Sequence, residues 1–270
     1  MINNNIRKTW LIVFRIRKFM TAQKIRLDKL LIDRGVAPTL ERARALILAR
    51  AVKVNDAYPD KAGELVPADA EIHIKGEDNP YVSRGGLKLA GALKEFGLNV
   101  EGIVALDVGA STGGFTDCLL HSGARKVYAL DVAYGQLAWK LREDKRVIVI
   151  ERTNIRYYDG ADLDERIDLA VIDASFISLK VVIPAVLKFL GDVAGILALV
   201  KPQFEVEKGE VGKKGVVSDP DLHERVLRDI SAFCESLNLE VQGTCVSPVL
   251  GPEGNKEFFI LARKKRKNGN

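Results

Sequence analysis

The chain has 270 residues, of which 47% are hydrophobic and 29% are charged, and its formal net charge is +5. This composition excludes a largely disordered chain, and the length is enough for one large domain and one small domain. The basic balance favours a polyanionic partner but is too mild to identify one.

Residues 1–23 are expected to be a disordered extension that precedes the folded domains. Their apolar run, "WLIVF", has five residues before an arginine interrupts it, whereas the core of a secretory signal has roughly 7–15. The most hydrophobic window, "VVIPAVLKFLGDVAGILALV", contains Pro184, Lys188 and Asp192, so it predicts a core helix and a strand instead of a membrane span of about 20 apolar residues. We therefore expect a cytoplasmic protein without membrane segments.

Residues 24–79 predict a small α+β domain. The segment "IRLDKLLIDRG" places leucines at helical spacing and ends on Gly35, a good helix terminator. Thr39 then precedes a second helical stretch, "LERARALILAR". The segments "AVKVND" and "EIHIK" alternate like short strands.

Basic side chains gather in this small domain, on its helices and at Lys53. From their pattern alone, a solvated surface and a phosphate-binding face are equally compatible with the sequence. The segments "RLDKLL", the arginine-rich helix and "AVKVN" resemble the S-four-like RNA-binding domain. The candidate RNA contacts, with one from the start of the next domain, are Arg26, Lys29, Arg34, Arg42, Arg44, Lys53 and Arg84.

Near residue 80, after the polar connection "GEDNPYVSRGG", the pattern changes. Five apolar runs, "GIVALDVG", "KVYALDV", "VIVIER", "IDLAVIDAS" and "GILALVKP", alternate with helical stretches. Such a pattern predicts a parallel sheet covered on both faces. The expected fold class is α/β, with a doubly wound Rossmann-like sheet over residues 80–262 and a basic tail over residues 263–270. Ligands of such sheets bind beyond the carboxyl ends of the strands.

A glycine-rich loop, "GASTGG", follows the first of these strands and opens a helix. Asp131 ends the next strand at a spacing suited to ribose hydroxyls. The spacing D-x-G-x-S-x-G-G departs from the dinucleotide fingerprint and resembles the first motif of S-adenosylmethionine-dependent methyltransferases. The resemblance implies S-adenosylmethionine as cofactor, and the candidate binding residues are Asp107, Gly109, Ser111, Thr112, Gly113, Gly114, Phe115, Asp131, Thr153 and Asn154.

Charged residues end two of the apolar runs, Asp173 after the fourth and Lys201 after the fifth. Glu257 lies at the start of a final strand, which we expect to be antiparallel, and Lys88 lies on a helix that Ser83 is able to cap. Each of these charges has an ordinary structural explanation by itself. Together, with "SRGGLKL", "DASFISL", "KPQFE" and "GNKEFF", they resemble the Lys-Asp-Lys-Glu tetrad of FtsJ-like ribose 2′-O-methyltransferases.

With the small domain in front, residues 24–262 resemble the TlyA (haemolysin-A) family. That resemblance implies methylation of a cytidine 2′-hydroxyl in ribosomal RNA, with ribosomal RNA or ribosomal subunits as partners, and we expect a monomer. It implies four catalytic residues, Lys88, Asp173, Lys201 and Glu257. A lysine beside the ribose hydroxyl serves either as the base or as a cation that orients the hydroxyl, and the sequence leaves these two roles open for Lys201.

Two other functions stay open, a membrane-active haemolysin and a noncatalytic RNA-binding factor in ribosome assembly. Methylation of a base amine is disfavoured because "DASF" lacks the prolines of the motif common in those enzymes. Methylation of a cytosine carbon is disfavoured because it needs a nucleophilic cysteine in the strand-end cluster. The cysteines, Cys118, Cys234 and Cys245, are scattered and predict neither disulfides nor a metal site.

Overall fold

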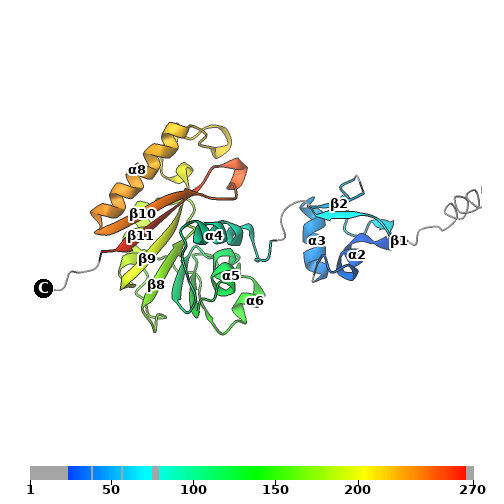
Figure 1. Ribbon diagram of the computed structural model, residues 1–270, viewed down its shortest axis with the longest axis horizontal. Helices are drawn as coiled ribbons and strands as arrows, with labels where there is room; N and C mark the ends of the chain where they lie inside the picture. Colours follow the sequence, from blue (N-terminus) through cyan, green and yellow to red (C-terminus); the bar gives the residue numbers. More distant parts are fainter. Residues whose placement is uncertain (1–23, 38, 56, 75–78, 266–270) are drawn as a thin grey trace, which may run out of the picture. The chain divides into compact units, whose positions relative to one another are not determined.

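The computed structural model describes residues 24–265 except 38, 56 and 75–78, and the side chain of residue 73 is not described either. The predicted extension, residues 1–23, and residues 266–270 of the predicted tail lie outside the described residues. The chain divides into two compact units, one that ends at Asp78 and one that begins at Asn79. Figure 1 shows the elements of each unit.

The described residues of the first unit form two helices and two pairs of antiparallel strands. The helices are α2 (Leu27–Asp33) and α3 (Leu40–Leu48). The strand pairs are β1 (Lys24–Arg26) with β3 (Leu65–Pro67), and β2 (Val52–Val54) with β4 (Ile72–Ile74). Thr39 caps α3 as expected, since its Oγ1 accepts the Arg42 N–H at 3.2 Å. Strands β1 and β3 were not expected from the sequence.

The second unit is built on a sheet of seven strands in the order β10-β11-β9-β8-β5-β6-β7. Strands β5 to β9 are parallel, while β10 and β11 are antiparallel to their neighbours. The predicted α/β fold class is confirmed. In chain order the strands are β5 (Val104–Val108), β6 (Lys126–Leu130), β7 (Val147–Ile150), β8 (Ile167–Ile172), β9 (Leu190–Val200), β10 (Leu239–Val246) and β11 (Phe258–Lys264).

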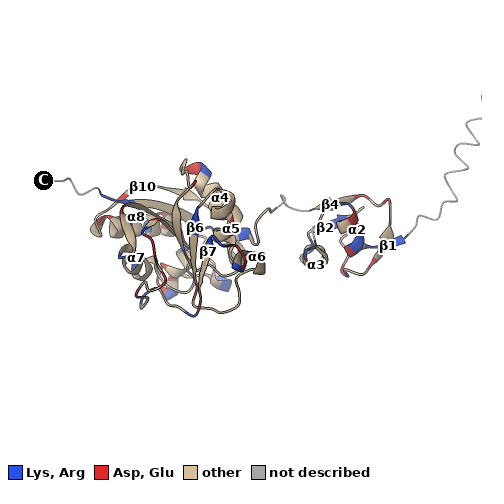
Figure 2. Ribbon diagram, turned by 90° about the horizontal axis from the view of Figure 1, so that it is seen from below, with Lys and Arg blue, Asp and Glu red and all other residues tan. Residues whose placement is uncertain are grey.

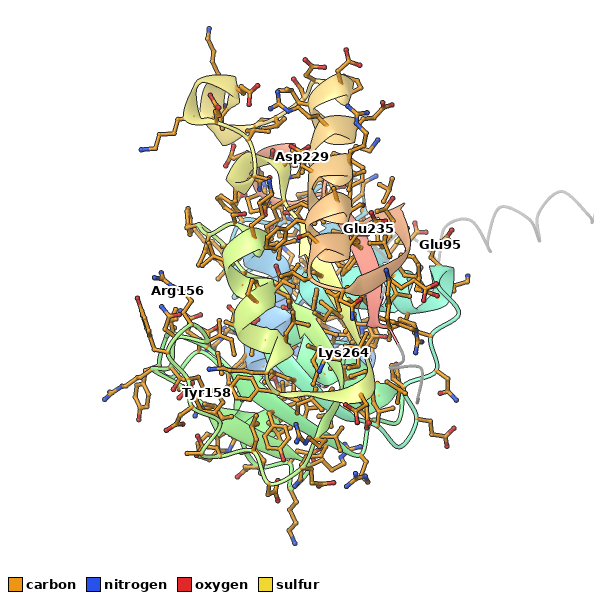
Figure 3. All side chains as sticks on the ribbon, turned by 90° about the vertical axis from the view of Figure 1, so that its left-hand side faces the viewer. Glu95, Arg156, Tyr158, Asp229, Glu235 and Lys264 are labelled. Atoms are coloured by element: carbon orange, nitrogen blue, oxygen red, sulfur yellow. The ribbon has the colours of Figure 1, made fainter. Side chains whose placement is uncertain are left out.

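Helices cover both faces of this sheet. On one face, α4 (Arg84–Glu95), α5 (Gly114–His121) and α6 (Trp139–Arg142) contribute to one apolar core. On the other face, α7 (Leu179–Leu187) and α8 (Pro220–Ser236) contribute to a second core, and Figure 3 shows both of these helices in front of the sheet. Short 3₁₀ turns follow β9 and precede β11, namely η1 (Pro202–Phe204), η2 (Lys208–Glu210), η3 (Lys213–Gly215) and η4 (Pro252–Gly254).

Basic and acidic residues are interspersed in the view of Figure 2. The final strand, β11, continues to Lys264, two residues into the predicted basic tail.

Within the described part of the chain, no helix is long and apolar enough to cross a membrane.

The strand order has a switch point between β5 and β8. From β5 the chain moves outward through β6 and β7, and it then returns to place β8 on the other side of β5. The loops that leave β5 and β8 touch, because Asp173 N–H donates to the Val108 carbonyl at 2.9 Å. Gly109 has φ +87°, and a Cβ there would lie 2.6 Å from the Asp173 carbonyl oxygen. Only glycine fits this crossing, and an open α/β sheet binds its ligand at such a point.

Candidate active site

A pocket of about 430 Å³ opens at the switch point, a volume within the usual range of small-molecule sites. Four segments contribute to it: the start of α4, the loop from β5 to α5, the loop after β8, and the segment Leu250–Pro252. A Cβ on Gly114 would overlap the Ser83 hydroxyl, so the starts of α4 and α5 meet without space between them. The predicted site residues that line the pocket are Arg84, Lys88, Gly109, Ser111, Thr112, Gly114, Phe115 and Asp173.

Asp107 lies at the carboxyl end of β5, two residues before the glycine-rich loop begins, and is 0% exposed. Thr116 donates a hydrogen bond to Asp107 Oδ2 at 2.7 Å, whereas Oδ1 has no hydrogen-bond partner among the described residues. Burial raises the pKa of this carboxyl from 3.8 to about 7, against the opposing hydrogen bond from Thr116. An unpartnered buried carboxylate oxygen is costly, and a cationic ligand group would satisfy it.

Asp131 connects the loop after β6 to the glycine-rich loop. Its two carboxylate oxygens accept N–H groups from Ser111 and Ala133, each at 2.7 Å. Ser111 has the left-handed φ of +49°, and its hydroxyl donates to Gln136 Oε1 at 3.1 Å. The carboxylate therefore holds the loop in shape, and each oxygen keeps a second lone pair for a ligand hydroxyl.

The remaining predicted cofactor residues shape turns. Gly113 has φ +95°, and a Cβ there would overlap Leu141. Thr153 donates its hydroxyl to the Glu151 carbonyl at 2.9 Å, and Asn154 accepts the Arg156 N–H at 3.1 Å. Neither Thr153 nor Asn154 lines the pocket.

The four predicted catalytic charges form two ion pairs. Lys88 Nζ lies 2.6 Å from Glu257 Oε2, and Lys201 Nζ lies 2.7 Å from Asp173 Oδ1. The two lysines are 9% and 8% exposed, so both amines are largely removed from water. Lys88 and Asp173 line the same pocket, which places one member of each pair at its wall.

Lys201 has a second polar partner that the sequence did not single out. Its Nζ donates a hydrogen bond to Ser175 Oγ at 2.8 Å. An amine nitrogen has three substituent directions besides its carbon, and Asp173 and Ser175 occupy two of them.

The loops after β8 and β9 are also tied together away from the lysine. Glu205 accepts the Ser178 hydroxyl at 2.6 Å and the Leu179 N–H at 2.8 Å, and burial raises the pKa of this carboxyl. Glu205 follows η1 directly, while Ser178 and Leu179 begin α7, so this contact fixes the register of the two loops. In the sequence, the glutamate of "KPQFE" had no distinguishing signal.

Phe176, between Asp173 and α7, was another residue missed by the sequence reasoning. It is 90% exposed, its backbone has φ +62°, and its ring centroid is 5.0 Å from that of Phe204. A bulky residue at positive φ is strained, and an exposed aromatic ring gains no burial in return. Strain and exposure together point to a binding role, which composition and periodicity do not display.

Two arginines stack on exposed tyrosines in the loops that follow β6 and β7. Arg152 lies 4.1 Å from the ring centroid of Tyr134, and Arg156 lies 5.0 Å from that of Tyr157. Both tyrosines are exposed, and Arg156 projects outward from the unit in Figure 3. These planar groups are suited to contact with bases or phosphates.

The predicted RNA contacts of the first unit have different surroundings. Arg34 donates to the carbonyls of Ala68 and Ala70, both at 2.6 Å, and so supports the turn before β4. Arg26 and Arg44 flank the buried carboxylate of Asp28. Lys29 is exposed, and Arg42 and Lys53 are half-buried. In the second unit, Arg84 donates to the Leu250 carbonyl at 3.4 Å beside the pocket.

Within the described ranges, no group of three or more His, Cys, Asp or Glu residues is arranged to hold a metal ion. Cys118 and Cys234 are buried, Cys245 is half-buried, and all three are free thiols. Burial raises the pKa of the Cys118 and Cys234 thiols to about 11, which disfavours the thiolate needed of a nucleophile.

The chain is similar to known proteins along most of its length. The FtsJ-like methyltransferase family matches residues 81–264. YqxC of Bacillus subtilis (strain 168), named as a candidate rRNA methyltransferase, is 48% identical over 89% of this chain and 86% of its own. The Mycobacterium tuberculosis protein named 16S/23S rRNA (cytidine-2'-O)-methyltransferase TlyA is 44% identical over 90% of this chain and 91% of its own. A solved structure described as a candidate hemolysin from Streptococcus thermophilus is 43% identical, with a TM-score of 0.71 over 91% of this chain and 90% of its own.

Proposed function

The chain belongs to the TlyA (haemolysin-A) family of FtsJ-like methyltransferases, and on that premise we propose that it methylates the ribose 2′-hydroxyl of a cytidine in ribosomal RNA. S-adenosylmethionine is the proposed methyl donor. The observation that carries the proposal is the pair of buried ion pairs, Lys88 with Glu257 and Lys201 with Asp173, at one pocket. A hydroxyl methyltransferase needs such groups, because the hydroxyl must lose its proton as it attacks.

Residues at the pocket and behind its glycine-rich loop fit the proposed donor, although Asp107 and Asp131 do not line the pocket themselves. S-adenosylmethionine supplies a methyl group on a positively charged sulfur. The unpartnered oxygen of Asp107 suits the ammonium of an amino-acid moiety, and Asp131 suits ribose hydroxyls. Arg84 and the starts of α4 and α5 border the same pocket and favour a carboxylate, since helix N-termini carry partial positive charge.

Lys201, as the cation of its ion pair, orients the acceptor hydroxyl. Asp173 and Ser175 fix the amine from two sides. The ammonium of Lys201 would stabilise the negative charge that develops on the attacking oxygen as the hydroxyl proton passes to water, and Asp173 holds the ammonium in place. Lys88, whose charge Glu257 balances, stabilises negative charge on the attacking oxygen from the pocket wall.

Ribosomal RNA would reach this site along exposed aromatic and arginine side chains. RNA is read largely through unstacked bases that stack on aromatic rings or on guanidinium planes. Phe176 stands three residues after Asp173 and is exposed, and the stacked pairs of Arg152 and Arg156 follow neighbouring strands. We assign Phe176 to the target base, and the first unit, with its S-four-like sequence, to more distant RNA.

Phe176→Ala is expected to lower kcat/KM for RNA by about 10- to 100-fold, because stacking on one aromatic ring contributes about 1–3 kcal/mol per base. Phe176→Tyr should retain activity within about threefold, since it keeps the ring. The measurement is steady-state methyl transfer with RNA as the varied substrate. Equal activity of the alanine variant and the wild type would remove Phe176 from the substrate site.

Gly251→Ala is expected to lower kcat by about 10²-fold, since small displacements of catalytic groups have effects of that size. Gly251 lines the pocket and has an ordinary φ of −71°, so alanine causes no backbone strain. A Cβ there would overlap the Glu257 carboxylate and displace it from Lys88. Gly209→Ala is the matched control, because a Cβ at position 209 meets nothing within 4 Å. Similar kcat values for the two variants would contradict the role of the Lys88–Glu257 pair.

The proposed function is tested with methyl-labelled S-adenosylmethionine and unmodified ribosomal subunits, followed by alkaline hydrolysis of the RNA. Label in alkali-resistant dinucleotides is the expected result, because a methylated 2′-oxygen blocks cleavage at that position. Label on single nucleotides would instead indicate base methylation. Absence of label, with cofactor binding also absent, would favour a noncatalytic RNA-binding factor. Leakage of liposomes caused by the pure protein would favour the membrane-active alternative.

A further inference from the structure

We propose that Asp28, a buried carboxylate of the first unit, positions Arg26 and Arg44 as a preformed pair of phosphate-binding groups. This inference rests on the proposed RNA-binding role of that unit. Asp28 is therefore a positioning residue, and the two arginines are the groups that touch RNA.

Asp28 joins two arginines from different elements. Arg26, the last residue of β1, donates from Nε to Asp28 Oδ1 at 3.0 Å and from Nη2 to Oδ2 at 2.7 Å. Arg44, on α3, places its Nε 3.5 Å from the same Oδ2. One carboxylate in the first turn of α2 thus holds guanidinium groups that are 18 residues apart in the sequence.

The burial of the three groups is uneven. The Asp28 side chain is 0% exposed, whereas those of Arg26 and Arg44 are 44% and 49% exposed. Each arginine side chain therefore contacts the carboxylate and is also about half exposed to solvent. A guanidinium has five N–H donors in a planar fork, so both arginines retain donors in the geometry that binds phosphate oxygens in pairs.

Gly63 contributes to this arrangement. A Cβ on Gly63 would lie 3.2 Å from three guanidinium atoms of Arg26, so the Arg26 group rests on the backbone at this glycine. The same segment is fixed to the start of α2, because the Asp28 N–H donates to the Ala62 carbonyl at 3.0 Å. The position of Arg26 is thus determined from two sides.

A buried carboxylate needs its cationic partners, because an unpaired charge away from water is strongly destabilising. The hydrogen bond from Arg26 is the main cause that lowers the pKa of Asp28, so the carboxylate is ionised at neutral pH. The arginines consequently lose their rotamer freedom when the unit folds and not when RNA arrives, and such preorganisation improves affinity.

Another arginine–aspartate ion pair in the same unit, Arg50 with Asp60, lacks a buried carboxylate and a second arginine. Arg50 lies 3.0 Å from Asp60, but both side chains are mostly exposed, at 66% and 75%. Exposed pairs of this kind are weakly held. Within the described residues of the first unit, only Asp28 is a buried carboxylate shared by two arginines.

For the substitution Asp28→Asn, the inference predicts a change in RNA affinity opposite in sign to the change that net charge alone predicts. Asp28→Asn removes a negative charge from a domain that binds a polyanion, so charge alone predicts tighter binding. Positioning predicts about tenfold weaker binding, because the two guanidinium groups are released. Asp33→Asn makes the same charge change at an exposed site at the end of α2, and it should bind as tightly as the wild type or slightly more tightly.

The test uses the full chain and ribosomal subunits. It measures the binding affinity at two salt concentrations, methyl transfer with RNA varied, and thermal unfolding. We expect a tenfold higher KM for Asp28→Asn with kcat unchanged at saturating RNA. An affinity equal to or above that of the wild type would overturn the inference.

A second variant covers the case in which Asp28→Asn fails to fold. Arg26→Lys keeps both the charge and Asp28 but removes the planar fork, and weaker binding of this variant supports the inference, whereas unchanged binding overturns it. Different results would reject the proposed function on which this inference rests. If Arg26→Ala combined with Arg44→Ala binds RNA like the wild type, the RNA-binding role of this face is wrong, and absence of methyl transfer by the wild type rejects the enzymatic proposal.

Discussion

Lys201→Ala should lower the rate of methyl transfer by at least about 10³-fold while S-adenosylmethionine still binds. Removal of one group that stabilises a developing oxyanion costs about 10²–10³-fold, and Lys201 also orients the hydroxyl, which adds a proximity contribution. The loss should appear in single-turnover rates with saturating RNA. Cofactor affinity, measured by calorimetry, should stay within about threefold, because Lys201 is not among the residues that line the pocket.

The structure also indicates that this variant should fold. The substitution Lys201→Ala leaves Asp173 without its cationic partner. The Asp173 side chain is 23% exposed, however, and remains accessible to water. Lys145→Ala is the control, because this exposed lysine precedes β7 at the opposite edge of the sheet. If Lys201→Ala lost cofactor binding and transfer together, its role would be structural.

The sequence predicts the location of the site better than its contacts. Asp107, Asp131, Asp173 and Lys201 each end an apolar run, and the carboxyl ends of parallel strands lie at one edge. Their common location could therefore be inferred once the sheet was recognised. The pairing of each lysine with one carboxylate could not be inferred, because it depends on side-chain directions at the ends of separate elements.

Other features were missed for identifiable physical reasons. Strand β10 was not expected: its residues alternate in burial, but Gly243, where the pairing with β11 is irregular, weakens the strand signal. The exposure of Phe176 was missed because an aromatic residue in a sequence reads as core. Asp28 was read only as part of a helix start, since a short-range pattern does not show that Arg44 lies beside it.

Three of the missed residues, Ser175, Glu205 and Asp28, share one function in the structure. Ser175 and Glu205 hold the loops after β8 and β9 in register, and Asp28 does the same for two arginines. Groups that touch substrate often stand out in a sequence by their chemistry. Groups that position them are ordinary polar residues, and only their hydrogen bonds and burial distinguish them.

Asp107→Asn should make the free protein more stable at pH 8 and bind S-adenosylmethionine more weakly. The pKa of Asp107 is about 7 in the folded chain and 3.8 as its ordinary value. Between these pH values the folded state holds a proton that the unfolded chain has released, so stability falls as pH rises through this window. At about 1.4 kcal/mol for each tenfold change in proton affinity, the loss reaches at most about 4 kcal/mol.

Asparagine is neutral and lacks this pH dependence. The difference in unfolding free energy between the variant and the wild type should therefore rise from about pH 4 to about pH 7 and stay constant above, as measured by urea unfolding at several pH values. Thr116→Val removes the hydrogen bond that lowers the pKa of Asp107. The pH range over which this variant loses stability should therefore extend to higher pH. Parallel stability curves for wild type and Asp107→Asn would show that burial does not hold the proton.

Cofactor binding should respond in the opposite direction. The ionised carboxylate is the form that attracts the ammonium of S-adenosylmethionine, so wild-type affinity should increase as pH rises through 7, and Asp107→Asn should lose at least about tenfold at pH 8. The variant would then be more stable without the cofactor and less able to bind it. That combination distinguishes a carboxylate kept for ligand binding from one kept for folding, because removal of a structural carboxylate would reduce stability and affinity together.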